Sequence, residues 1–198
     1  MFAHQITLCM IYLYLARHGE TQENVAQILQ GHMPGHLTPQ GREQAANLRD
    51  QLVKSGIHFD VLLYSDLQRT HDTATIINQQ LRVACVKPCP LLRERDWGSF
   101  TGTSIVAARS LPIPPDAESV EQLFKRAQRF LIYIKEFFDG KTILAIGHGL
   151  FNRTILAAYN NKSIRDIQRM QNAEVRLLAF DKLPSAWTSS TSDIVSAN

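Results

Sequence analysis

Residues 10–18 read Met-Ile-Tyr-Leu-Tyr-Leu-Ala-Arg-His, and residues 142–148 read Thr-Ile-Leu-Ala-Ile-Gly-His. Each stretch is an apolar run that ends at a histidine with a neighbouring glycine. A short run of this kind, rich in Ile, Leu and Tyr, predicts a strand that is buried on both faces, as in a parallel sheet. We therefore predict strands at Met10–Ala16 and Thr142–Gly147, with His18 and His148 just past their carboxyl ends.

Helical and extended patterns alternate along the rest of the chain. Thr38-Pro39 and Ser119 with Gln122 are typical of helix N-termini, and Gly56 and Gly140 are typical of the positions just after a helix. Such alternation predicts an α/β fold around a largely parallel sheet. The other predicted elements are helices from Thr38 to Gly56, Asp66–Leu81, Ser119 to Gly140 and Leu150–Tyr159, strands Phe59–Ser65, Val83–Val86 and Glu174–Asp181, and a loop from Trp97 to Asp116.

Composition excludes several classes of protein. The 198 residues are 44% hydrophobic and 20% charged, which fits a folded chain, and we expect a single domain over residues 1–198 with a loosely held tail at 183–198. The net charge of +3 is too small to predict binding to nucleic acid. No apolar run reaches the roughly 18 residues of a membrane span. Three cysteines favour a reducing compartment, so we expect a cytoplasmic protein with no nucleic-acid or membrane partner.

The apolar stretch Ile6–Ala16 could also be a signal peptide. No Lys or Arg precedes Arg17, and the residues that follow form no small-x-small cleavage site. We therefore interpret this stretch as the first strand. Residues 1–9 are predicted to be dispensable, either as an extension upstream of a start at Met10 or as a short strap over the sheet edge.

The two histidines suggest a single chemical site. Open α/β sheets bind ligands just past the carboxyl ends of their strands, so His18 and His148 could converge there. A neutral imidazole is a competent nucleophile near neutral pH, and attack on a phosphoryl group would give a phosphohistidine. Arginine suits the surrounding positions because its planar fork meets phosphate in bidentate geometry. Arg17 adjoins the first histidine, and Arg69 follows the second predicted strand.

These residues resemble the opening of the histidine phosphatase superfamily, which includes cofactor-dependent phosphoglycerate mutases and many phosphatases. Further blocks resemble the family in the family's order, from about residue 11 to 181. The matching segments are Arg17-His18-Gly19-Glu20-Thr21, Asn24, Gln30-Gly31, Leu37-Thr38 with Gly41, Ser65–Arg69 with Thr73-Ala74, Leu92-Arg93-Glu94 with Gly98 and Gly102, Glu118-Ser119, and Gly147-His148-Gly149.

The resemblance implies a phosphoglycerate mutase-like three-layer α/β/α sandwich whose last strand runs antiparallel, with no metal and no cofactor. It also implies a role for each matching residue. His18 would be the phosphorylated nucleophile, and Glu94 would donate the proton to the leaving group. The phosphate pocket would be completed by Arg17, Arg69 and His148, and the phosphate or substrate would be contacted by Asn24, Gln30 and Gly31.

The expected function is hydrolysis of a small phosphorylated metabolite through a phosphohistidine. A phosphoglycerate mutase is the first alternative, and an inactive module that binds a phosphorylated ligand is the second. Only 23 residues separate Glu94 from Glu118, and mutases of this kind carry a long insertion there that excludes water, so hydrolysis is favoured. Departures from the family pattern leave the substrate open; they lie at Asp96-Trp97, Asp116-Ala117 and Leu150–Arg153. The sequence does not specify the oligomeric state.

Overall fold

In the computed structural model, which describes residues 9–188, five strands form one sheet in the order β3-β2-β4-β1-β5. Strands β1 to β4 run parallel to one another, and β5 runs antiparallel to β1. The mostly parallel sheet and its antiparallel last strand confirm the expectation. The strands are β1 (Ile11–Arg17), β2 (Val61–Tyr64), β3 (Cys85–Pro88), β4 (Thr142–Gly147) and β5 (Val175–Phe180).

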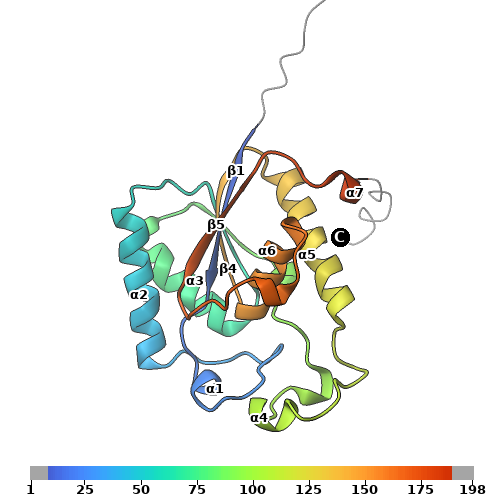
Figure 1. Ribbon diagram of the computed structural model, residues 1–198. Coiled ribbons are helices and arrows are strands. Elements are labelled where there is room, and N and C mark those ends of the chain that lie inside the picture. The colour runs from blue at the N-terminus through green and yellow to red at the C-terminus, as the bar shows by residue number, and fades with distance from the viewer. Residues whose placement is uncertain (1–8, 189–198) are drawn as a thin grey trace, which may run out of the picture.

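Helices cover both faces of the sheet and complete the predicted three layers. Figure 1 shows α2 (Pro39–Lys54) and α3 (Gln68–Leu81) on one face, with α5 (Val120–Phe137) and α6 (Gly149–Tyr159) on the other. Shorter helices lie outside these layers: α1 (Gln22–Val25), α4 (Ile105–Ala108) and α7 (Ser185–Thr188). Among residues 9–188, no helix combines the length and apolar composition needed to cross a membrane.

The two central strands are buried on both faces, as their apolar runs predict. Leu13 and Leu15 of β1 join the core under α5 and α6, whereas Ala16 joins the core under α2 and α3. Alternating residues of β4 divide in the same way. Each fully buried Leu or Ile contributes roughly 1.5–3 kcal/mol to folding, so these strands anchor both layers.

One strand boundary differs from the prediction because a side chain forms hydrogen bonds with the backbone there. Strand β3 begins two residues later than expected because Asn78 bonds both the N–H of Val83 (2.8 Å) and its carbonyl (3.2 Å). Val53 of α2 and Val120 of α5 are apolar but 43% and 52% exposed. Adjacent helical residues lie about 100° apart, so Leu52 faces the sheet and Val53 does not.

The predicted loop after Trp97 is more ordered than expected. It contains a 3₁₀ turn (Gly98–Phe100) and α4, and it returns to the segment near Leu29. Leu29 donates its N–H to Thr103 at 2.9 Å and accepts from the N–H of Gly102 at 2.8 Å. These bonds hold the loop as a wall beside the carboxyl ends of the strands.

The expected loose tail begins as a packed segment. Leu183 and Trp187 are partly buried against the core under α5 and α6. Residues 189–198 lie outside the described residues, and so do residues 1–8, on which the prediction of a dispensable extension falls.

The N-terminus of α2 packs directly on the loop that carries His18. A Cβ atom built on Gly41 would lie 2.0 Å from the carbonyl oxygen of Glu20, and one built on Gly19 would lie 2.3 Å from the carbonyl oxygen of Gly41. Both contacts are with backbone atoms, which cannot rotate away. Thr38 reinforces the contact by donating its N–H to the carbonyl of Glu20 at 3.0 Å.

We therefore expect Gly41→Ala to lower the free energy of unfolding by about 1–3 kcal/mol, as overpacking typically does. Urea unfolding measures the change. The control is Gln40→Ala, since Gln40 is the exposed neighbour of Gly41 in the same helical turn, and it should change stability by about 0.5 kcal/mol or less. A Gly41→Ala protein as stable as the control would contradict the close approach.

Candidate active site

The pairing of β1 with β4 brings the two histidines together. Arg17 pairs with Gly147 in the register, so the next residue of each strand is a histidine. The N–H of His18 donates to the carbonyl of Gly147 at 3.1 Å. The two imidazole rings lie 5.2 Å apart between centroids and meet edge to face at 62°. The predicted convergence of His18 and His148 is thus what the backbone geometry produces.

The ring of His18 is oriented by its own loop. Nδ1 lies 2.7 Å from the carbonyl oxygen of Gly19, and a carbonyl only accepts, so Nδ1 carries the proton. The lone pair is therefore on Nε2. Burial, together with the charges of Arg69 and Arg17, holds the pKa of His18 well below its ordinary value. The imidazole is neutral at physiological pH, which is the state a nucleophile needs.

His148 takes the opposite tautomer. Arg69 donates Nε–H to Nδ1 of His148 at 3.2 Å, so the proton of a neutral ring sits on Nε2. Burial and the charge of Arg69 hold the pKa of His148 well below its ordinary value. Nε2 is buried and has no hydrogen-bond partner among the described residues. His148 does not itself line the cleft, and its Nε2–H is a donor suited to an anion beside His18.

Arg69 is buried and Arg17 is half-buried, and backbone carbonyls anchor both side chains. Arg69 is 1% exposed and donates Nη2–H to Gly31 at 2.9 Å. Burial lowers the pKa of Arg69 to about 10, which leaves it charged at neutral pH. Arg17 donates Nη1–H to the carbonyl of Met170 at 2.8 Å, and its buried Nε has no partner in the described part of the chain. An anion at this point would accept from Nε of Arg17.

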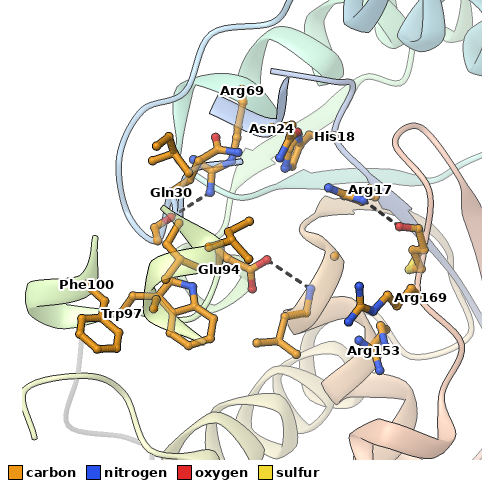
Figure 2. A pocket seen from close by; sticks show the side chains of 18 of the residues that line it. Arg17, His18, Asn24, Gln30, Arg69, Glu94, Trp97, Phe100, Arg153 and Arg169 are labelled. Atoms are coloured by element: carbon orange, nitrogen blue, oxygen red, sulfur yellow. Dashed lines mark hydrogen bonds between the residues drawn. The ribbon is translucent and has the colours of Figure 1, made fainter. Parts of the chain in front are cut away.

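Glu94 lies in the cleft with its carboxylate against the N-terminus of α6 (Figure 2). Oε2 accepts from the N–H of Leu150 at 3.2 Å, and Oε1 accepts from the N–H groups of Phe151 at 3.1 Å and Arg95 at 2.9 Å. Sequence reasoning did not find this second role, in which Glu94 bonds free donors of the first turn of α6. The carboxylate is held by backbone groups alone.

The neighbours of Glu94 point elsewhere. Arg93 donates Nε–H to Asp66 at 2.7 Å, and Arg95 donates Nε–H to the carbonyl of Glu118 at 2.8 Å. Asp96, the next carboxylate along the chain, accepts from the N–H of Gly98 at 2.9 Å and does not line the cleft. Glu94 is therefore the carboxylate placed to reach a ligand there.

Asn24, Gln30 and Gly31 all line the cleft. Asn24 also has a structural role, since its Oδ1 accepts from the N–H of Thr21 and from Nδ2 of Asn172, both at 3.2 Å. Asn172, which sequence reasoning missed, donates to the carbonyl of His18 at 3.1 Å as well. Oε1 of Gln30 is buried without a partner among the described residues.

The cleft has a volume of about 450 Å³. The polar residues described above, among them Arg17, His18 and Arg69, form its floor, and two walls lie beside this floor (Figure 2). Trp97, Phe100 and Ile105 form an apolar wall, and Arg153 and Arg169 form a basic one. None of these wall residues was predicted. Arg153 lies on α6 one turn after Gly149, so helical spacing was a usable signal for it, whereas Arg169 and Trp97 lie in irregular segments without such a signal.

Buried neutral histidines and anchored arginines at the carboxyl ends of parallel strands define a site for a phosphoryl anion. The sequence matches the histidine phosphatase superfamily (branch 1) over residues 13–190, and the chain belongs to that family. It is an enzyme of the family, which contains both phosphatases and phosphoglycerate mutases.

Individual relatives fall in both groups. The chain is 31% identical over 149 residues to the adenosylcobalamin/alpha-ribazole phosphatase of Escherichia coli K12, covering 69% of this chain and 72% of the relative. It is 28% identical over 176 residues to a 2,3-bisphosphoglycerate-dependent phosphoglycerate mutase of Rhizobium etli, covering 79% and 84%. The solved alpha-ribazole phosphatase of Shigella flexneri aligns with a TM-score of 0.75 at 26% identity, covering 84% of this chain and 89% of that one.

The lowered pKa values of His18 and His148 predict loss of stability in acid. Below about pH 6.5 the unfolded chain binds protons that the folded chain refuses, so the free energy of unfolding falls as the pH drops. Between pH 7.5 and 5.5 the two histidines together should cost up to roughly 2–3 kcal/mol. Urea unfolding in phosphate-free buffer measures this loss.

The variant His18→Asn/His148→Asn should lose less stability over that pH range. His58→Asn is the control because it removes an exposed imidazole, and it should behave as the wild type does. If the double variant loses as much stability in acid as the wild type, the acid sensitivity does not come from the lowered pKa values of these two histidines.

Proposed function

We propose that the protein is a phosphomonoesterase that hydrolyses a small phosphorylated metabolite through a phosphohistidine at His18. The observation that carries the proposal is the orientation of His18, whose Nδ1–H is held by Gly19 so that the Nε2 lone pair is free in an arginine-lined cleft. Similarity to the E. coli phosphatase supports the same reaction class. The three cysteines of the present chain are free, which fits a reducing compartment such as the cytoplasm.

The first half of the reaction transfers the phosphoryl group to the protein. Nε2 of His18 attacks phosphorus, a P–N bond forms, and the bond from phosphorus to the leaving-group oxygen breaks. Glu94 gives its proton to that oxygen, so an alcohol departs. Arg17 and the Nε2–H of His148 face the charge on the equatorial oxygens, where fixed donors stabilise the transition state.

The second half returns the protein to its starting state. Water attacks phosphorus, and Glu94, now a carboxylate, takes a proton from it. The P–N bond to His18 breaks and inorganic phosphate leaves. A mutase differs only here, because a second substrate oxygen would accept the phosphoryl group in place of water. Phosphorus NMR with 3-phosphoglycerate distinguishes the two outcomes, since hydrolysis releases inorganic phosphate and mutase activity yields 2-phosphoglycerate.

His18→Ala should lose at least about a thousandfold in kcat, because the covalent step has no other nucleophile. In the wild type, a quench without acid should trap phosphate on His18 that is labile to acid and stable to base. The control is His71→Ala on α3, whose ring contacts Tyr64 and does not line the cleft, and it should keep activity within about twofold. Full turnover by His18→Ala would overturn the mechanism.

Glu94→Gln tests the proton donor through the leaving group. An alkoxide must be protonated as it departs, whereas p-nitrophenolate leaves without help. We expect a loss of roughly a hundred- to ten-thousandfold in kcat/KM on alkyl or sugar phosphates and a much smaller loss on p-nitrophenyl phosphate.

Asp96→Asn is the matched control and should leave the leaving-group dependence unchanged. Urea unfolding of Glu94→Gln measures the stability that is lost with the hydrogen bonds between Glu94 and α6, so this loss can be separated from the loss of activity. Equal losses on both substrates would show that Glu94 serves structure or binding.

A further inference from the structure

The cleft carries more positive charge than a phosphoryl group requires. Among the described residues that line it are five arginines and a single carboxylate, Glu94. A phosphomonoester dianion is matched by Arg17 and Arg69 at the floor of the cleft. Three arginines then remain on the walls, where they would face the leaving group; they are Arg109, Arg153 and Arg169.

Arg153 is fixed in place. Its Nε donates to the carbonyl of Ile167 at 2.8 Å, and its Nη2 donates to the carbonyl of Ile164 at 2.6 Å. Its third nitrogen, Nη1, makes no hydrogen bond in the described part of the chain. Burial lowers the pKa of Arg153, and the charges of Arg169 and Arg176 lower it further, against a smaller opposing effect of Glu94. These like charges repel Arg153, and a bound anion would relieve that repulsion.

The backbone that carries Arg169 is fixed too, although its side chain is not. Arg176 donates Nη2–H to the carbonyl of Arg169 at 3.0 Å, and Arg17 donates to the next carbonyl, that of Met170, at 2.8 Å. The guanidinium of Arg169 is exposed and has no hydrogen bond or ion pair among residues 9–188. Figure 2 shows it beside Arg153, on the far side of Glu94 from Gln30.

A second hollow of about 480 Å³ adjoins the cleft at this wall. It shares Trp97, Leu150, Arg153 and Arg169 with the cleft, and no Asp or Glu is among the described residues that line it. Arg153 and Arg169 therefore stand between two open spaces. Among the described residues that line these spaces, Glu94 of the cleft is the one carboxylate, and it forms no ion pair with either arginine. Arg109 lies apart from them, in the segment that forms the apolar wall just after α4, and it lines only the first space.

We propose that Arg153 and Arg169 form a second anion subsite, which binds a carboxylate or a second phosphate on the leaving group of the substrate. The proposal rests on the proposed function, because it assigns the substrate class of the same site: phosphomonoesters whose leaving group carries its own negative charge. Two neighbouring guanidinium forks suit either oxyanion, since both present paired oxygens to paired N–H donors.

The test uses alkyl phosphates that are matched except at one end. Three- and five-carbon phosphomonoesters that end in a methyl group, a carboxylate or a second phosphate are compared by kcat/KM at constant ionic strength. The wild type should prefer an anionic end over methyl by about tenfold or more in at least one chain length. The carboxylate and phosphate arms identify which anion the subsite takes.

Arg169→Gln is the informative variant because the side chain of Arg169 holds no backbone group. It should reduce the preference roughly three- to tenfold, through a higher KM for the anionic substrates, and leave the methyl-ended substrate within about twofold. Arg169→Lys should recover part of the preference. Arg129→Gln, which removes an exposed arginine that lines neither hollow, should behave as the wild type.

The possible outcomes distinguish a failure of the proposed anion subsite from a failure of the proposed phosphatase function. A wild type that hydrolyses all these esters with no preference in either series overturns the anion subsite and leaves the phosphatase intact. Equal losses on methyl-ended and anionic substrates in Arg169→Gln overturn it as well, because Arg169 would then serve the phosphoryl group. A wild type that hydrolyses none of them, nor p-nitrophenyl phosphate, overturns the proposed function itself.

Discussion

The hydrogen-bonded register between β1 and β4 is the constraint on which the site depends. Because Arg17 lies opposite Gly147, the chain leaves both strands at the same level and places His18 and His148 next to each other. A shift of this pair by one residue would exchange the side chains packed under α5 and α6 with those packed under α2 and α3, so both cores would have to repack. Glycines near the ends of the two strands then allow neighbouring atoms to approach closely. A Cβ atom on Gly147 would lie 2.4 Å from Oδ1 of Asn152, as the corresponding atom on Gly19 would meet Gly41.

The cleft holds several charged side chains, most of which the fold satisfies with backbone groups. Arg69, Arg17 and Arg153 all donate to carbonyl oxygens, and Glu94 accepts from N–H groups. Anchoring by the backbone fixes the direction of each side chain without placing an opposite charge beside it. The positive charges therefore remain available to a ligand. The same charges favour the neutral form of both histidines.

Much of this could be predicted from the sequence because it depends on local patterns. The apolar runs of β1 and β4 specify buried strands, and the residue after each strand is placed by the fold class alone. The walls could not be predicted in this way. Trp97 and Arg169 reach the cleft through irregular segments whose paths are set by tertiary hydrogen bonds, such as those from Arg176 to the backbone near Arg169. The burial of His148 behind His18 also depends on side-chain packing, which no spacing rule gives.

The difference between floor and walls explains how one family can hold enzymes that act on different substrates. The floor is built from strand ends, and changing it would disturb a sheet that is buried on both faces. The walls are joined to the fold by looser connections: Leu29 bonds the segment after Trp97, and three arginine side chains hold the carbonyls of residues 164–170. Loop segments tolerate sequence change because few core contacts depend on them. Selection for a new leaving group can therefore act on the walls while the phosphoryl chemistry that we propose for His18 stays the same.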